Sequence, residues 1–221
     1  MVRKVVWLAA MIVLVAAAPA FAQPRVEISG ILGWTFSDGV TGEAVLAGDG
    51  NLYDEIDVAD AVSWGFSIGV LATEGAEVGF MYGRQESRFD VKGTNTVEVG
   101  DMAVSTYHGY FAYNFGAADS PVRPYVLGGI GATSYGKVPF TFAGTSRETG
   151  GETQFSTTWG AGVKFVPSRG IGVRAGVQWT PTYIKSDAAG WWCDPFWGCY
   201  VVGDAQYANQ FAFNGGVIFR F

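Results

Sequence analysis

The ionisable residues with the clearest spacing fall at alternate positions inside apolar segments. They are Glu27, Glu77, Lys164, Arg174 and Arg220, and in each case the opposite face of the segment is apolar. Successive side chains of a strand point to opposite faces, so these five residues share the polar side of a sheet. Isolated charges are costly to bury, and opposite charges are therefore expected to pair. The sequence predicts a buried ion-pair layer, which is either a structural plug or a gate for small ions.

A second candidate site is an aromatic segment that carries both cysteines, Cys193 and Cys199. Around them lie Trp191, Trp192, Phe196, Trp197 and Tyr200. Two thiols do not complete a zinc site, which needs four ligands, and an exported chain would form a disulfide. One interpretation is a braced apolar contact site for a partner, a glycan or a lipid. The alternative is that these rings belong to an interfacial belt or pack over the end of the fold.

An acidic segment precedes the second apolar stretch. It contains Asp49, Asp54, Glu55, Asp57 and Asp60. Clustered carboxylates can bind Ca²⁺ or Mg²⁺. The spacing is not that of an EF-hand, because position six counted from Asp49 is Asp54 rather than glycine. We expect a solvated loop, and no metal or cofactor is predicted.

Strict alternation of apolar and polar residues recurs along the chain and predicts strands. The candidates span residues 26–36, 62–70, 76–83, 106–115, 122–135, 155–165, 171–179 and 210–221. The stretch 122–135 is rich in glycine, and its two faces are not assigned from the sequence. Most are about as long as a tilted strand that crosses a bilayer. One face is aromatic and β-branched, and the other is rich in Gly, Ser, Gln and Asn, as expected for a membrane barrel with a polar interior. A soluble barrel of the lipocalin type would have the reverse arrangement.

The links between these candidate strands alternate in length. Long links cover residues 37–61, 90–98, 136–153 and 182–206, and short ones cover 73–75, 116–121 and 167–169. Outer-membrane barrels combine short periplasmic turns with longer surface loops. An even number of strands would place both ends of the chain on the periplasmic side.

The N-terminal segment has the layout of a secretory signal peptide. Arg3 and Lys4 precede an apolar run over 5–18, and Ala20-Phe21-Ala22 provides small residues around a cleavage point. We expect residues 1–22 to be removed and 23–221 to form the barrel; the alternative is a retained anchor. The mature chain would carry 12 Lys and Arg against 20 Asp and Glu, which disfavours a nucleic-acid partner. Charged residues make up 15%, against roughly 25% in ordinary soluble domains.

Two motifs resemble a known family. Arg-Pro-Tyr-Val-Leu-Gly-Gly-Ile-Gly at 123–131 and Gly-Gly-Val-Ile-Phe-Arg-Phe at 215–221 are similar to strands of the OmpA/OmpX-like outer-membrane barrels. The resemblance implies an all-β, eight-stranded antiparallel up-and-down transmembrane barrel in the outer membrane. It also implies that Phe219 and Phe221 form the signal read by the barrel-assembly machinery. Expected partners are outer-membrane lipid and lipopolysaccharide, with a surface ligand as a further candidate, and the expected state is a monomer.

His108, the only histidine, is the residue to test for catalysis of the lipid A deacylase type. A nucleophilic hydroxyl needs a base within reach. Ser105 falls on the opposite face, Thr106 and Tyr110 share the inward face, and no His-x-Ser pair is present. We therefore expect no catalytic residues and a lumenal histidine held by hydrogen bonds.

Three functions follow, in order of preference. The first is a non-enzymatic surface barrel with loops for structural, ligand or adhesive contact. The second is a narrow channel for small or apolar solutes. The third is an outer-membrane lipid-modifying enzyme.

Overall fold

The computed structural model describes residues 25–38, 40–46, 52–117, 120–142, 145–148, 151–167, 170–184, 192–194, 198–200 and 206–221. The expected signal peptide lies outside these residues. Within these ranges, no helix is long and apolar enough to cross a membrane.

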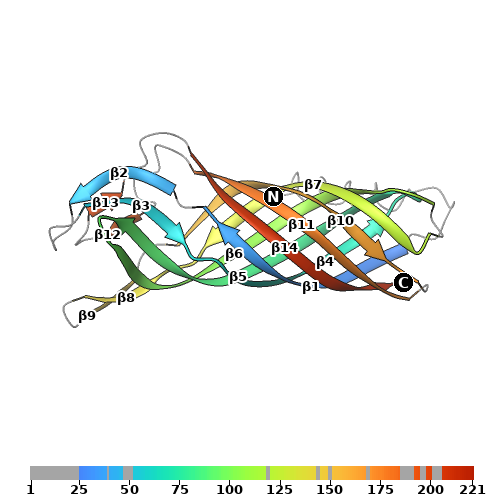
Figure 1. Cartoon of the computed structure of the whole chain (residues 1–221), viewed down its shortest axis with the longest axis horizontal. Helices are drawn as coiled ribbons and strands as arrows, with labels where there is room; N and C mark the ends of the chain where they lie inside the picture. The colour runs from blue at the N-terminus through green and yellow to red at the C-terminus, as the bar shows by residue number, and fades with distance from the viewer. Residues whose placement is uncertain are drawn as a thin grey trace, which may run out of the picture.

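Eight antiparallel strands close into a barrel (Figure 1). They are β1 (Arg25–Ser37), β4 (Ala61–Leu71), β5 (Ala76–Gly93), β6 (Thr96–Asn114), β7 (Val122–Tyr135), β10 (Glu152–Phe165), β11 (Ile171–Ile184) and β14 (Gln206–Arg220). Each strand pairs with the next along the chain, and β1 pairs with β14. The Val26 amide donates to the Phe221 carbonyl at 3.2 Å, and the Phe221 amide returns a bond of 2.9 Å. The predicted fold class is confirmed.

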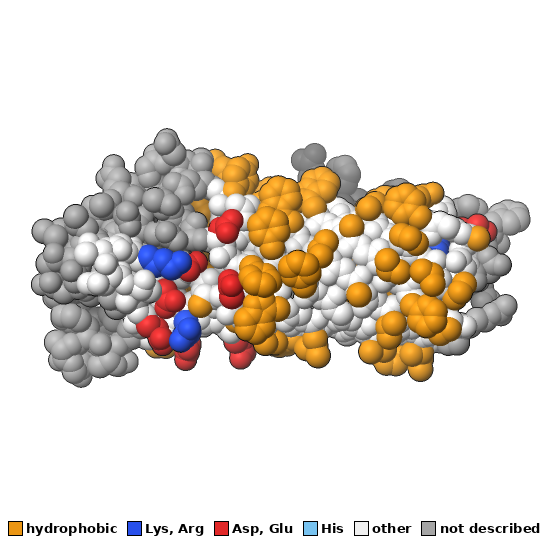
Figure 2. Space-filling view, viewed as in Figure 1, with side chains coloured by type: hydrophobic (Ala, Val, Ile, Leu, Met, Phe, Trp, Pro, Cys, Tyr) orange, Lys and Arg blue, Asp and Glu red, His pale blue; other side chains and the backbone are white. Residues whose placement is uncertain are grey.

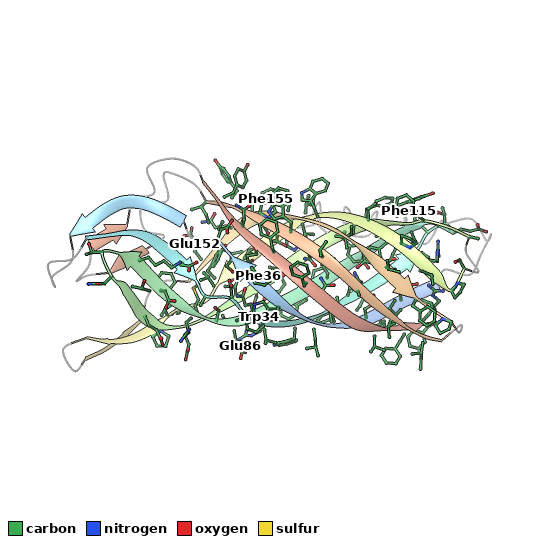
Figure 3. The ribbon with its side chains drawn as sticks, viewed as in Figure 1. Trp34, Phe36, Glu86, Phe115, Glu152 and Phe155 are labelled. Carbon is green, nitrogen blue, oxygen red and sulfur yellow. The ribbon has the colours of Figure 1, made fainter. Side chains whose placement is uncertain are left out.

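The two faces of the wall differ as the alternation predicts. Outward-facing Leu32, Ile130 and Phe213 are 66%, 68% and 61% exposed, whereas the polar side chains between such residues are mostly buried. Figure 3 places exposed Phe115 near one end of this apolar zone and exposed Phe36 and Phe155 near the other. We call the first the turn end, because the short turns at 72–75, 115–121 and 166–170 lie there, and the second the loop end. A solvent-facing barrel would not expose an apolar zone of this extent.

The long links contain strands of their own, which the sequence did not predict. The first link forms the hairpin of β2 (Val40–Leu46) and β3 (Leu52–Val58), and β3 pairs with the far part of β5. The others form β8 (Pro139–Phe142) with β9 (Thr145–Glu148), and β12 (Trp192–Asp194) with β13 (Gly198–Tyr200). All gather at the loop end, opposite the C-terminus (Figure 1).

The expected loop at 90–98 is instead the tip of one long hairpin, in which β5 and β6 continue well beyond the apolar zone. Alternation failed to predict this extension for two reasons. Its outward residues are charged, as at Glu86, Arg88 and Asp101, and the register shifts between Phe89 and Asp90. An extended strand that leaves the lipid no longer needs an apolar outer face, so its sequence resembles a loop.

A first prediction concerns Gly131 on β7. A Cβ built there would lie 2.8 Å from the Cα of His108 and would overlap the Tyr107 carbonyl oxygen on β6. We expect Gly131→Ala to force these strands apart and lower the free energy of unfolding by about 1–3 kcal/mol. Urea titration of the protein refolded in lipid vesicles, followed by tryptophan fluorescence, would measure this.

Gly30 provides the matched control for that experiment. Its Cβ would meet nothing within 4 Å, so Gly30→Ala should be neutral or slightly stabilising. Equal losses in the two variants would show that the close approach of β6 and β7 is not what requires glycine.

Candidate functional site

The lower lumen, near the turn end, is crossed by a layer of buried charges. Lys164 on β10 donates through Nζ to Glu27 Oε2 at 2.6 Å and to Glu77 Oε2. Arg220 on β14 donates through Nε to the other oxygen of Glu27, at 2.9 Å. Glu27, Glu77 and Lys164 are each only 2% exposed. Four of the five predicted lumen charges therefore meet in one layer that spans the barrel.

The fifth predicted charge, Arg174, lies apart from this layer, which corrects the sequence-based expectation. Its guanidinium donates through Nη2 to the Tyr125 hydroxyl at 2.8 Å and lies 4.9 Å from the centroid of that ring. In the β10–β11 register Arg174 is directly opposite Lys164. Like charges at such positions repel. Because Lys164 forms ion pairs with both Glu27 and Glu77, Arg174 packs on the ring of Tyr125 instead.

Three further polar residues complete the layer, and sequence reasoning missed their roles in it. Tyr110 donates its hydroxyl to Glu77 Oε1 at 2.6 Å, and Asn114 donates its amide to Glu77 Oε2 at 3.2 Å. Arg123 donates to the Asn114 carbonyl at 3.2 Å and to the Glu74 carbonyl. Arg123 and Tyr125 lie two residues apart on β7, and both point into the lumen. The prolines and glycines near them interrupt the apolar–polar alternation, so the sequence does not show which face of this strand points inward.

Two tyrosine rings fill the lumen above the charges, and glycines make room for them. A Cβ at Gly79 would lie 2.7 Å from the ring of Tyr110, and one at Gly162 would lie 2.7 Å from the Tyr125 hydroxyl. Met81, Ala112 and Leu127 pack with the two rings as a buried cluster. Inward glycines therefore make room for aromatic rings at this level of the lumen. We call the ion-pair layer and this cluster together the lumen plug.

His108 lies higher in the lumen, in a network of hydroxyls. Its Nε2 is 2.9 Å from Ser156 Oγ, and Thr133 donates to the same oxygen at 2.9 Å. The histidine is fully buried, and its Nδ1 has no hydrogen-bond partner. A catalytic base of the triad type would be oriented by an acid on that nitrogen. Alternation identified the face of His108, but the partner, 48 residues away, depends on the register of β6, β7 and β10.

A small cavity of about 80 Å³ remains in the upper lumen. Its lining includes Thr35, Gln85, Gln178, Gln210 and Asn214. Gln210 donates to Gln85 Oε1 at 3.0 Å, so part of the lining is already hydrogen-bonded. This volume is large enough for a few water molecules.

The acidic segment is partly described. Asp57 forms an ion pair with Lys92 at 2.5 Å, and Asp60 accepts a bond from the Ser37 amide at 3.1 Å. Asp49 lies outside the described residues, and Asp54 and Glu55 lie on β3 without described side chains. Among the residues whose placement is described, no group of three His, Cys, Asp or Glu could hold a metal ion.

The aromatic segment is described only along the backbone of β12 and β13. Trp192 pairs with Tyr200 and Cys193 with Cys199 in the antiparallel register. Trp191, Phe196 and Trp197 lie outside the described residues. At the other end of the barrel, Phe219 and Phe221 face outward and are 45% and 76% exposed.

Comparison with known proteins identifies the family. The family model described as the outer membrane protein beta-barrel domain matches residues 6–221, almost the whole chain. This chain is an outer-membrane β-barrel. The resemblance inferred from the sequence motifs is thereby confirmed, and the family places the barrel in the outer membrane. Its turn end is then periplasmic and its loop end extracellular.

Solved structures show the same fold at low sequence identity. OprG of Pseudomonas aeruginosa aligns with a TM-score of 0.62 and 14% identity, over 90% of this chain and 96% of that chain. AlkL, solved in DMPC bilayers, aligns with a TM-score of 0.54 and 13% identity, over 92% of this chain and 94% of the AlkL chain. The outer membrane protease OmpT of Escherichia coli aligns with a TM-score of 0.51 and 10% identity, over 91% of this chain and 99% of the OmpT chain. A search of curated protein sequences found no significant match. Identities this low establish the fold alone.

Proposed function

We propose that this outer-membrane barrel is non-enzymatic and acts through its extracellular strands and loops, with the β12–β13 hairpin as the contact site. The lumen plug is the observation that carries this proposal. Charges at Glu27, Lys164 and Glu77 and rings at Tyr110 and Tyr125 occupy successive levels of the interior. Eight-stranded barrels have just enough interior for side chains to fill.

The form of the extracellular end supports a role in contact. Outside the membrane, β3 extends the sheet alongside β5, so the loop end is a scaffold of paired strands. The β12–β13 hairpin concentrates aromatic residues there, which are favoured in binding surfaces.

A disulfide between Cys193 and Cys199 is part of this proposal. Directly opposed residues of antiparallel strands have Cα atoms about 4.5–5.5 Å apart, within the range that a disulfide spans. Such a bond would hold the hairpin in one shape and lower the entropy lost on binding.

The contact proposal is tested by replacing residues 191–200 with a glycine-serine linker. Wild-type and variant barrels, both refolded in nanodiscs, would be applied to a glycan array and to supported lipid bilayers. We expect signals of the wild type to fall by at least about tenfold in the variant, as loss of one or two aromatic anchors would cause. Unchanged signals, or no wild-type signal on any surface, would contradict the proposal.

A narrow channel is the second candidate, and the cavity of about 80 Å³ in the upper lumen is the observation that favours it. The lumen plug predicts that the purified wild-type barrel shows no discrete openings in planar bilayers under concentrated potassium chloride. Glu77→Gln serves as the comparison, because it removes one carboxylate of the plug. Discrete openings in the wild type that change in this variant would favour the channel and overturn the first proposal.

A further inference from the structure

A groove of about 510 Å³ lies on the outer surface of the barrel at the extracellular end. It crosses the extended parts of β5 and β6 and reaches the residues that follow β7. The charged residues that line it are Asp60, Arg84, Glu86, Arg88, Asp101 and Lys137. Figure 2 shows charged side chains gathered just beyond the apolar zone, and Figure 3 shows Glu86 projecting outward there.

The groove begins where an aromatic cluster ends. Trp64, Tyr82 and Tyr107 lie side by side on β4, β5 and β6, with ring centroids 5.8 Å and 5.2 Å apart for the two neighbouring pairs. Arg84 is the next outward residue after Tyr82 on β5. Aromatic girdles of outer-membrane barrels lie at the membrane–water interface. The groove is therefore at the level of the lipid head groups of the outer leaflet.

The arginines of the groove form ion pairs that an incoming ligand could replace. Arg84 pairs with Glu86 through Nε at 3.2 Å, and Arg88 pairs with Glu98 through Nη1 at 3.2 Å. Both glutamates have side chains more than half exposed. Exposed ion pairs contribute little free energy, so an incoming anion can replace them at small cost. Asp101 stands directly opposite Arg88 in the register and is exposed.

We propose that this groove binds the phosphorylated head group of an outer-leaflet lipid, with the acyl chains lying along the aromatic cluster. Arg84 and Arg88 provide planar guanidinium groups that bind phosphate through two parallel hydrogen bonds. Glu86 and Asp101 provide oxygen ligands for a divalent cation shared with the phosphate oxygens. Three basic and three acidic side chains line the groove, so the net formal charge of its lining is zero. Continuity with the aromatic cluster favours a lipid over a soluble anion.

The test uses the full barrel in detergent micelles and measures bound lipid by native mass spectrometry. The probes are lipid A with Mg²⁺, dephosphorylated lipid A, and inorganic phosphate as a competitor. We expect lipid A to bind at least about tenfold more tightly than its dephosphorylated form, as one charge-assisted contact would give. Equal binding of both lipids, or displacement of lipid A by millimolar phosphate, would overturn the proposal.

Two variants and one control locate the site. Arg84→Gln with Arg88→Gln should weaken lipid A binding about 10- to 100-fold, whereas Glu86→Gln with Asp101→Asn should abolish its dependence on Mg²⁺. Lys92→Gln removes a cation from the same strand that pairs with Asp57 and does not line the groove, so binding should be unchanged. Heat-modifiable mobility on gels verifies folding of each variant. Equal loss in the Lys92 and arginine variants would overturn the assignment of the site.

Discussion

Lys164→Gln is expected to lower the free energy of unfolding of the barrel by about 3–5 kcal/mol. Lys164 is the only described side chain that joins both buried carboxylates, Glu27 and Glu77. Without its ammonium group, Glu77 keeps only the neutral donors Tyr110 and Asn114. A buried carboxylate with no cation retains its desolvation cost and loses the compensating attraction. Equilibrium unfolding in urea, with the barrel in lipid vesicles, measures the loss.

The double variant Glu77→Gln with Lys164→Gln separates charge from packing. It removes both partners of one ion pair, while Glu27 keeps its bonds to Arg220. We expect the double variant to be at least about 1 kcal/mol more stable than Lys164→Gln alone, because no carboxylate is then left without a cation. A double variant no more stable than the single one would mean that the shape of Lys164, and not its charge, holds the layer.

Tyr125→Ala is expected to cost a similar amount, about 3–5 kcal/mol, for a different reason. The ring is 3% exposed and packs with Met81 and Leu127 in the buried cluster. Its neighbours Gly162 and Gly176 have no side chains that could fill the space, so truncation leaves a cavity. It also leaves the Arg174 guanidinium without the ring and hydroxyl that it contacts. The same urea titration measures this loss.

Tyr125→Phe is the matched control, because it keeps the ring and removes only the hydroxyl. Arg174 would then lose one hydrogen bond but keep its position over the ring, and the expected cost is about 1–3 kcal/mol. Equal costs for the alanine and phenylalanine variants would show that the hydrogen bond, and not the seating of the ring, stabilises this level of the lumen.

Both predictions concern side chains of the lumen plug. The charge layer and the tyrosine rings lie at successive levels and share Tyr110, which bonds to Glu77 and packs in the cluster. Loss of either level should therefore also loosen the other, and double-mutant cycles between Lys164 and Tyr125 would measure this coupling. A plug built in this way favours function at the extracellular surface.

The sequence by itself determined the membrane-spanning strands and, except on β7, the direction of their faces. Alternation has a period of two, so a residue such as Lys164 or Leu32 can be placed inside or outside from its neighbours alone. Charges on the inward face then had to pair, which is why five residues could be selected together: Glu27, Glu77, Lys164, Arg174 and Arg220. All of them except Arg174 meet in the layer. The lengths of the links and the terminal aromatics indicated the membrane and its two sides.

Only the tertiary structure decided which inward residues meet. Alternation carries no information about register between strands distant in sequence, and barrel closure with its stagger fixes that register. Hence His108 could be placed in the lumen but not beside Ser156, and Arg174 could be placed inside but not on Tyr125. The extension of β5 and β6 escaped detection because its outer face meets water, where the apolar pattern that identifies a membrane strand is not required.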